Sequence, residues 1–232
     1  NKEKADLNND SLTVKDCYFE YVYATLLVYE RSVPNITFDG IYLDGVKADK
    51  GRPALSWFKI SHLFDSTITV INSNLRNGNH RSGSNQLFTI AGAVTSTGSS
   101  AADYNTGNVK AVIKNNYVVD GQNSADALFN VDADCVASLN VTGNTFISTK
   151  NTEQLITLAN NRGLSADELK TASLSGNITF DGNTLIGFAS NKINLDLGLG
   201  ENPTLTDTYY SSTTDGLADA NAFTGSYVSG MG

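Results

Sequence analysis

Proline, methionine, cysteine and long hydrophobic runs are all scarce in this sequence, and each shortage excludes a class of protein. The 232 residues include 3 Pro, 1 Met and 2 Cys. Two thiols cannot build the disulfide framework of a small secreted domain. No apolar run is long enough to span a bilayer, so we expect no membrane span. With 40% hydrophobic residues, the chain has enough apolar material for one sizeable globular domain.

Basic residues are also few. The 16 Lys and Arg residues are outnumbered by 24 Asp and Glu residues, which gives a formal net charge of −8. A protein that wraps nucleic acid needs clustered Lys and Arg to neutralise phosphates. We therefore expect no nucleic-acid partner.

The two cysteines, Cys17 and Cys135, do not have the spacing of a zinc site. A bridge between them is one interpretation. The other is that both are free, since buried cysteine commonly behaves as a small hydrophobic residue.

One eight-residue pattern occurs six times along the chain. Its first, third and eighth positions are apolar in every copy. Such alternation predicts short strands with one buried face. The copies begin at Leu12, Ile36, Ile68, Ala111, Leu139 and Ile178. The third position, expected to form one stacked interior row, is occupied by Val14, Phe38, Val70, Ile113, Val141 and Phe180.

The fifth position of this octet is always Asp, Asn or Gly, the residues that best tolerate a left-handed backbone. We expect positive φ and a bend between two short strands at Asp16, Gly40, Asn72, Asn115, Gly143 and Gly182. The sixth position is asparagine in the last three copies. These residues, Asn116, Asn144 and Asn183, are expected to stack inside the fold and to satisfy one another's hydrogen bonds.

A second pattern lies between the octets, with apolar residues at its second and fourth positions. Its copies are TLLV from Thr25, WFKI from Trp57, LFTI from Leu87, LFNV from Leu128 and LITL from Leu155. This pattern adds a third strand to each unit. Units of three short strands with constant bends and variable loops predict the coils of a parallel β-helix, a solenoid, rather than propeller blades.

In these recurring positions the sequence resembles the right-handed parallel β-helix proteins of the pectate-lyase-like superfamily. The resemblance covers residues 11–198 and implies an all-β, single-stranded right-handed solenoid of about six coils with three short strands per coil. Residues 199–232 are expected to be a C-terminal tail that packs on the helix flank, similar in composition to closing segments of polysaccharide-associated bacterial surface proteins. Residues 1–10 are expected to be a linker or the remnant of an upstream region, since the only methionine is Met231.

The resemblance also implies a flank for ligand binding, formed by the outer face of the strands of the second pattern and by the turns that lead to them. One outward row on this flank is largely apolar, and such a row needs a cover or a partner. It contains Thr25, Trp57, Leu87, Leu128 and Leu155. Either a loop or the tail packs over this row, or the row is a sugar platform on which Trp57 is the stacking ring.

Basic residues gather in two successive turns on the same flank. Because stacked coils lie about 4.8 Å apart, these turns are expected to be neighbours and to form a positive patch. Such a patch would attract a uronate or sulfated polysaccharide; the alternative is a pair of solvated loops. The expected binding residues are Trp57, Lys47, Lys50, Arg52, Lys59, Arg76, His80 and Arg81.

The patch also offers candidates for catalysis. Elimination at a uronic acid needs a base and a cation, often Ca²⁺ held by carboxylates. The candidates for base and electrophile are Arg76, Arg81, Lys59 and His80, and those for Ca²⁺ are Asp132 and Asp134. The Arg-x-Pro-x-x-Arg signature of pectate lyases is absent.

Three functions fit this sequence. The first is a secreted or cell-surface bacterial domain, extracellular or periplasmic, that binds a neutral or anionic polysaccharide without catalysis. The second is a polysaccharide lyase that acts on an acidic glycan. The third is a structural spike or adhesin stalk. One scaffold can host all three, so the fold alone does not separate them.

Overall fold

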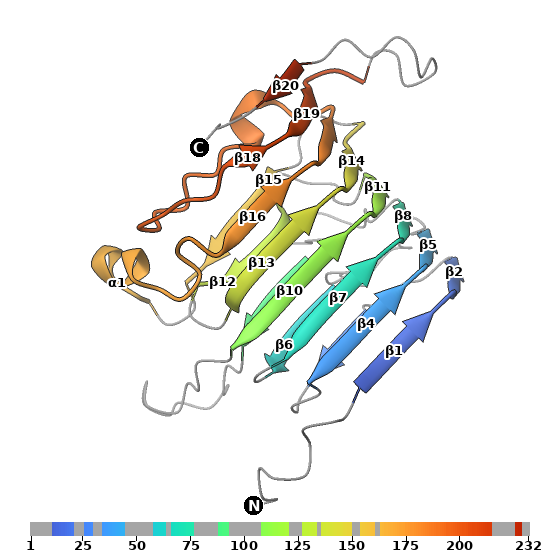
Figure 1. Cartoon of the computed structure of the whole chain (residues 1–232), viewed down its shortest axis with the longest axis horizontal. Helices are drawn as coiled ribbons and strands as arrows, with labels where there is room; N and C mark the ends of the chain where they lie inside the picture. Colours follow the sequence, from blue (N-terminus) through green and yellow to red (C-terminus); the bar gives the residue numbers. More distant parts are fainter. Residues whose placement is uncertain are drawn as a thin grey trace, which may run out of the picture.

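The structure is a computed structural model of the chain (Figure 1). It describes residues 11–20, 26–29, 34–44, 58–63, 66–76, 88–92, 108–120, 127–133, 136–149, 154–160, 163–214 and 226–228. Within these ranges, no helix has both the length and the apolar character needed to cross a membrane.

Over residues 11–186 the chain visits three sheets in turn and then returns to the first, so that neighbouring strands of a sheet come from successive repeats (Figure 1). The first sheet contains, in order, β1 (Ser11–Lys15), β4 (Asn35–Asp39), β7 (Thr67–Ile71), β10 (Val109–Lys114), β13 (Val136–Thr142), β16 (Ile178–Asp181) and β18 (Leu205–Thr206). The second contains β2 (Tyr18–Glu20), β5 (Tyr42–Asp44), β8 (Asn74–Arg76), β11 (Tyr117–Val119), β14 (Thr145–Ile147), β17 (Thr184–Ile186), β19 (Thr208–Ser211) and β20 (Ser226–Val228). The third contains β3 (Leu26–Tyr29), β6 (Phe58–Leu63), β9 (Phe88–Gly92), β12 (Ala127–Asp132) and β15 (Gln154–Ala159).

The strand pairings in these sheets are parallel, except that β20 pairs antiparallel with β19. The prediction of an all-β protein with parallel strands is therefore confirmed. The recurring order of the three sheets is consistent with a β-helix solenoid.

The register of the first sheet confirms the predicted interior row. Successive partners are Val14, Phe38, Val70, Ile113, Val141 and Phe180. All are at most 3% exposed except Val14, which is half-buried. Inside the fold, the Phe129 ring of the third sheet stacks on Phe88 and meets the edges of Phe146 and Phe180. One aromatic side chain thus joins all three sheets in a single core.

The bend predicted at the fifth octet position is confirmed in all six copies. The φ angles there lie between 52° and 65°, at Asp16, Gly40, Asn72, Asn115, Gly143 and Gly182. A left-handed residue also follows two strands of the second sheet, Asp120 after β11 (φ 47°) and Gly187 after β17 (φ 78°). We did not predict this second bend from the octet, although both residues stand at the same distance from its first position.

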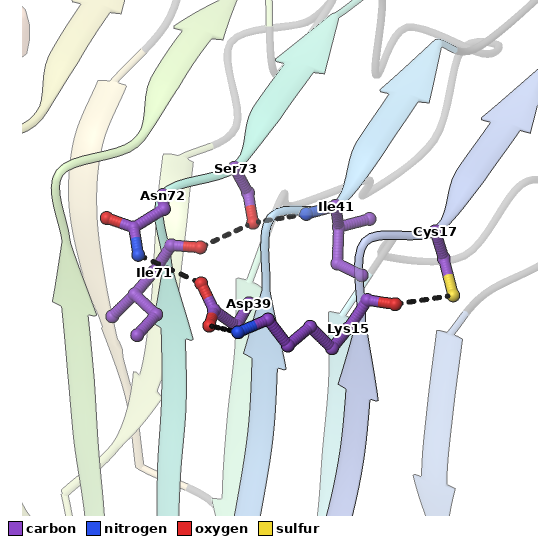
Figure 2. A network of polar contacts seen from close by, with 7 residues as sticks. All are labelled: Lys15, Cys17, Asp39, Ile41, Ile71, Asn72 and Ser73. Atoms are coloured by element: carbon purple, nitrogen blue, oxygen red, sulfur yellow. Dashed lines mark hydrogen bonds and ion pairs between the residues drawn. The ribbon is translucent and has the colours of Figure 1, made fainter.

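Polar contacts join the first three bends on the outer side of the fold, as Figure 2 shows. Lys15 Nζ lies 3.4 Å from Asp39 Oδ2, and Asn72 Nδ2 donates a hydrogen bond of 2.9 Å to Asp39 Oδ1. The Asn72 amide, with a smaller contribution from Lys15, holds the pKa of Asp39 below its ordinary value. Cys17 is a free thiol that donates to the Lys15 carbonyl at 3.3 Å, whereas Cys135 lies outside the described residues.

The predicted asparagine stack is present inside the fold. Asn116, Asn144 and Asn183 are each at most 2% exposed. Asn116 Nδ2 donates to Asn144 Oδ1 at 3.0 Å, and Asn144 Nδ2 donates to Asn183 Oδ1 at 3.1 Å. Ser73 precedes them in the same column, and its backbone N–H donates to Asn116 Oδ1 at 2.9 Å. The stack therefore ties the bends of successive repeats together without leaving their amides unsatisfied.

Gly143→Val is expected to destabilise the domain by about 1–3 kcal/mol, because a β-branched residue is strained at positive φ. Gly143→Asn is the matched control. Asn72 and Asn115 already adopt this conformation at the same octet position, so we expect a smaller loss. Urea unfolding of both variants measures the difference. Equal losses would show that side-chain bulk, and not the left-handed backbone, decides the cost.

Two strands beyond residue 198 continue the first and second sheets, although we assigned this region to a tail. Leu205 of β18 pairs with Phe180, and Tyr210 of β19 pairs with Leu185. Asp207 between these strands has a φ of 44°, like the earlier bends. Residues 203–210 therefore form a further copy of the octet, with proline at its first position. The boundaries between residues 1–10, 11–198 and 199–232 remain predictions.

Two short helices lie among the described parts of these repeats. The helix α1 (Ala166–Lys170) precedes β16, and the 3₁₀ helix η2 (Ser190–Lys192) lies between β17 and β18. At the end of the second sheet, β20 covers the edge of β19. An uncovered edge strand would offer its free backbone groups to another chain.

Candidate functional site

Most of the residues expected to bind or react lie outside the described part of the chain. These are Lys47, Lys50, Arg52, Trp57, His80, Arg81 and Asp134. For Lys59, the structure places the backbone in β6, where it pairs with Leu27 and Thr89. The predicted basic patch and the role of Trp57 therefore remain predictions.

The register nevertheless relates the two basic segments. Lys47, Lys50 and Arg52 follow β5 in the sequence, and His80 and Arg81 follow β8. The last residues of these strands, Asp44 and Arg76, are register partners. The two segments therefore leave the second sheet from adjacent positions.

The apolar row on the third sheet is covered at the two positions whose burial the structure describes. Leu128 is 1% exposed and Leu155 is 0% exposed. Both belong to the same hydrophobic cluster as Phe188 and Ile193 from the segment after β17. At these two positions the row is part of the core; packing of a loop or the tail over the row stays a prediction.

Asp132, the described member of the proposed Ca²⁺ pair, is the last residue of β12 and is 1% exposed. Among the described residues, no group of three or more His, Cys, Asp or Glu side chains could hold a metal ion. Because Asp134 is not described, the Ca²⁺ site stays a prediction.

A row of tyrosines that we did not predict runs across the outer face of the second sheet. Register partners along this row are Tyr18, Tyr42, Asn74 and Tyr117, on β2, β5, β8 and β11 (Figure 1). Tyr18 is 63% exposed and Tyr117 is 38% exposed, whereas the alternate residues, such as Leu43 and Leu75, are fully buried. The sequence does contain a signal for this row. The seventh octet position precedes the apolar eighth position in a strand, so its side chain lies on the opposite, outer face of the sheet.

The rings of Tyr18 and Tyr42 are parallel, with an interplanar angle of 6° and centroids 4.7 Å apart. This is offset stacking, in which neighbouring rings overlap only partly. The centroid distance equals the spacing of adjacent parallel strands. The geometry of the sheet itself therefore aligns the two rings.

Arg76 lies beside this row, two residues after Asn74 on β8. Its Nε donates a hydrogen bond of 2.8 Å to Asn74 Oδ1, and its guanidinium carbon lies 5.3 Å from the centroid of the Tyr117 ring. The amide fixes one edge of the guanidinium, and the ring attracts its positive charge. We call the surface formed by Tyr18, Tyr42, Asn74, Arg76 and Tyr117 the tyrosine strip.

The tyrosine strip combines two kinds of recognition chemistry. Its rings offer apolar surface for the C–H faces of a flat ligand, and the phenol, amide and guanidinium groups offer hydrogen bonds. From Tyr18 to Tyr117 the strip crosses four strands, a distance of about 14 Å at the usual strand spacing. It can therefore contact several units of an extended polymer.

No protein-family model matches the chain, and neither does any curated protein or solved structure. Function is therefore inferred from the surface of this chain alone.

Proposed function

We propose that this domain binds a polysaccharide on the tyrosine strip and has no catalytic role of its own. The observation that carries the proposal is the stacked pair of Tyr18 and Tyr42. Tyr18, at the end of the tyrosine strip, is 63% exposed. Exposed aromatic side chains in a contiguous patch mark a binding surface. Sugars suit such a patch, since a pyranose ring has an apolar face and a rim of hydroxyl groups.

We also infer that residues 11–198 form a right-handed β-helix of about six coils, similar to the pectate-lyase-like superfamily. Crossovers between parallel strands are right-handed in nearly all proteins. The left-handed bends and the internal asparagine stack support the likeness. A polysaccharide ligand suits a secreted, cell-surface or periplasmic bacterial domain, which is the location we propose.

The experiment is a glycan array followed by titration of the glycans that bind. Replacing both Tyr18 and Tyr42 by Ala is expected to weaken binding at least about tenfold, which corresponds to about 1.4 kcal/mol of lost stacking. Thr184→Ala is the matched control, because Thr184 occupies the same octet position two repeats beyond Tyr117. This variant should bind like the unaltered protein.

Trp57→Ala separates the tyrosine strip from the platform on the third sheet. Lost affinity at unchanged melting temperature would place the sugar on Trp57. A lower melting temperature at unchanged affinity would show that Trp57 belongs to an apolar row over which a loop or the tail packs. If the tyrosine variants and Trp57→Ala all leave glycan binding unchanged, the sugar lies on neither surface and this proposal is wrong.

The runner-up function is a polysaccharide lyase, which Arg76 favours because a guanidinium on an exposed surface can neutralise a uronate carboxylate during elimination. The test for this function is the release of unsaturated product, which is measured by its absorbance in the presence and absence of Ca²⁺. A lyase would lose product formation in Arg76→Gln while it still binds the glycan. A spike or stalk would show neither binding nor product.

A further inference from the structure

We infer that this chain forms a symmetric dimer, in which the edge of β1 pairs antiparallel with β1 of a second copy. The two copies meet at the end of the stack of repeats that contains β1, β2 and β3. This inference concerns a different surface from the tyrosine strip and does not depend on the proposed function.

The first repeat ends all three sheets. The strands β1, β2 and β3 are the outermost strands of the first, second and third sheets, and the next repeat supplies their partners β4, β5 and β6. Among the strands that the structure describes, none lies beyond these three, and Figure 1 shows β1 and β2 at one end of the stack. An open strand edge of this kind pairs readily with another strand.

The core is open at the same end. Leu12 is 41% exposed, although its register partner Ile36 and the next residue of that row, Ile68, are fully buried. Phe19 is half-buried, whereas its register partner Leu43 is fully buried. A terminal repeat that faces water normally carries a polar outer surface. Here the interior positions stay apolar, so this end needs a cover or a partner.

The backbone direction of β1 shows which groups face the open side. The Asp16 N–H donates a hydrogen bond of 2.9 Å to the Asp39 carbonyl at the end of β4. Successive residues of a strand direct their N–H and C=O groups to alternate sides. The even-numbered residues of β1 therefore bond to β4. Ser11, Thr13 and Lys15 present their backbone groups to the open side.

A second copy matches this edge in one antiparallel register. When Thr13 lies opposite the partner's Thr13, Ser11 lies opposite the partner's Lys15, so all three residues with open backbone groups form hydrogen-bonded pairs. Leu12 then faces the partner's Val14, and apolar side chains meet on the inner face. A shift by one residue would place inward side chains opposite outward ones. The register centred on Thr13 therefore uses the whole strand.

Charge and closure favour a two-fold dimer over a head-to-tail chain of copies. In this register Lys15 lies about 14 Å along the strands from the partner's Lys15, so the two like charges are not opposed. At the other end of the stack, β20 already pairs with the edge of β19. A head-to-tail contact would need that edge, whereas a two-fold contact uses the β1 edge of both copies and closes.

The first test measures the oligomeric state by light scattering and sedimentation over a dilution series. We expect a dimer that dissociates on dilution. Leu12→Glu should raise its dissociation constant at least tenfold, because a carboxylate would face the partner's apolar Val14. Thr179→Glu is the matched control, since Thr179 is exposed on β16 of the same sheet. This variant adds the same charge and should dimerise like the unaltered protein.

Disulfide cross-linking tests the register without changing an apolar position. In a Cys17→Ser, Cys135→Ser background, oxidised glutathione should join two copies of Thr13→Cys. Opposite Cα atoms in a hydrogen-bonded antiparallel pair lie about 5.5 Å apart, within the range of about 4.4–6.8 Å that a disulfide spans. Thr179→Cys in the same background should give no cross-linked dimer.

Four results would overturn the inference. The first is a monomer at every concentration, and the second is equal cross-linking of Thr13→Cys and Thr179→Cys, which would show random collision. A dimer that Leu12→Glu leaves intact would use another face. A dimer that Leu12→Glu dissociates but that Thr13→Cys does not cross-link would have another register. Thermal melting shows whether Leu12→Glu is folded; if it is not, the cross-linking result decides alone.

Discussion

Val141→Asp is expected to leave the domain unfolded at neutral pH. The Val141 side chain is fully buried between its register partners Ile113 and Phe180. An aspartate there would have to bury an unpaired carboxylate or be protonated, and either costs several kcal/mol. A domain is typically stable by only about 5–15 kcal/mol in total. Circular dichroism and thermal melting would show the loss of cooperative structure.

Asn140→Asp is the control for this substitution. Asn140 precedes Val141 in β13, but its side chain is exposed on the outer face of the first sheet. The same charge placed there should change stability by less than about 0.5 kcal/mol. If Val141→Asp melts like Asn140→Asp, the third octet position does not face a dry interior.

The features that could be predicted from the sequence are those that recur in every repeat. The interior position has to be apolar because it faces the same core in each repeat, from Phe38 to Phe180. The bend has to be Asp, Asn or Gly because its φ is positive each time. These are local requirements, so the chain carries them at a constant spacing.

The octet at residues 203–210 escaped prediction for a physical reason. It follows a longer connection after β17, and proline occupies its first position. Proline cannot donate a backbone hydrogen bond and is uncommon inside sheets. Here Pro203 lies two residues before the two-residue strand β18 at the end of the first sheet, so its missing N–H falls outside the strand.

The tyrosine strip was missed because outward positions obey no packing rule. Along this row the residues change from Tyr42 to Asn74 and back to Tyr117. These residues can be recognised as one surface only from the structure, in which the strand register places them side by side. The structure also shows the stacked rings of Tyr18 and Tyr42 and the contact between Arg76 and Tyr117. The segments after β5 and β8 vary in length and composition, so repeat spacing does not predict the positions of their basic side chains.

Asn144→Leu is expected to destabilise the domain by about 3 kcal/mol or more, although leucine has a similar size and greater hydrophobicity. Asn144 Nδ2 donates to the carbonyl of Ile113 at 2.9 Å, and Asn144 Oδ1 accepts from the backbone N–H of Asn116 at 2.9 Å. Leucine leaves both buried backbone groups without these partners, and each loss costs about 1–3 kcal/mol. Urea unfolding at constant m-value measures the change.

Asn140→Leu tests whether the position or the residue type is responsible. Asn140 lies four residues earlier, with its side chain on the exposed outer face, so the same substitution should cost little there. Asn144→Ser adds a graded case, because Ser73 occupies this column in an earlier repeat and accepts a hydrogen bond from the Ile41 backbone at 3.1 Å. A serine hydroxyl can replace one contact but cannot span two repeats as the amide does. We therefore expect a loss between those of Asn140→Leu and Asn144→Leu. An Asn144→Leu variant as stable as the unaltered protein would show that apolar packing alone holds the repeats together.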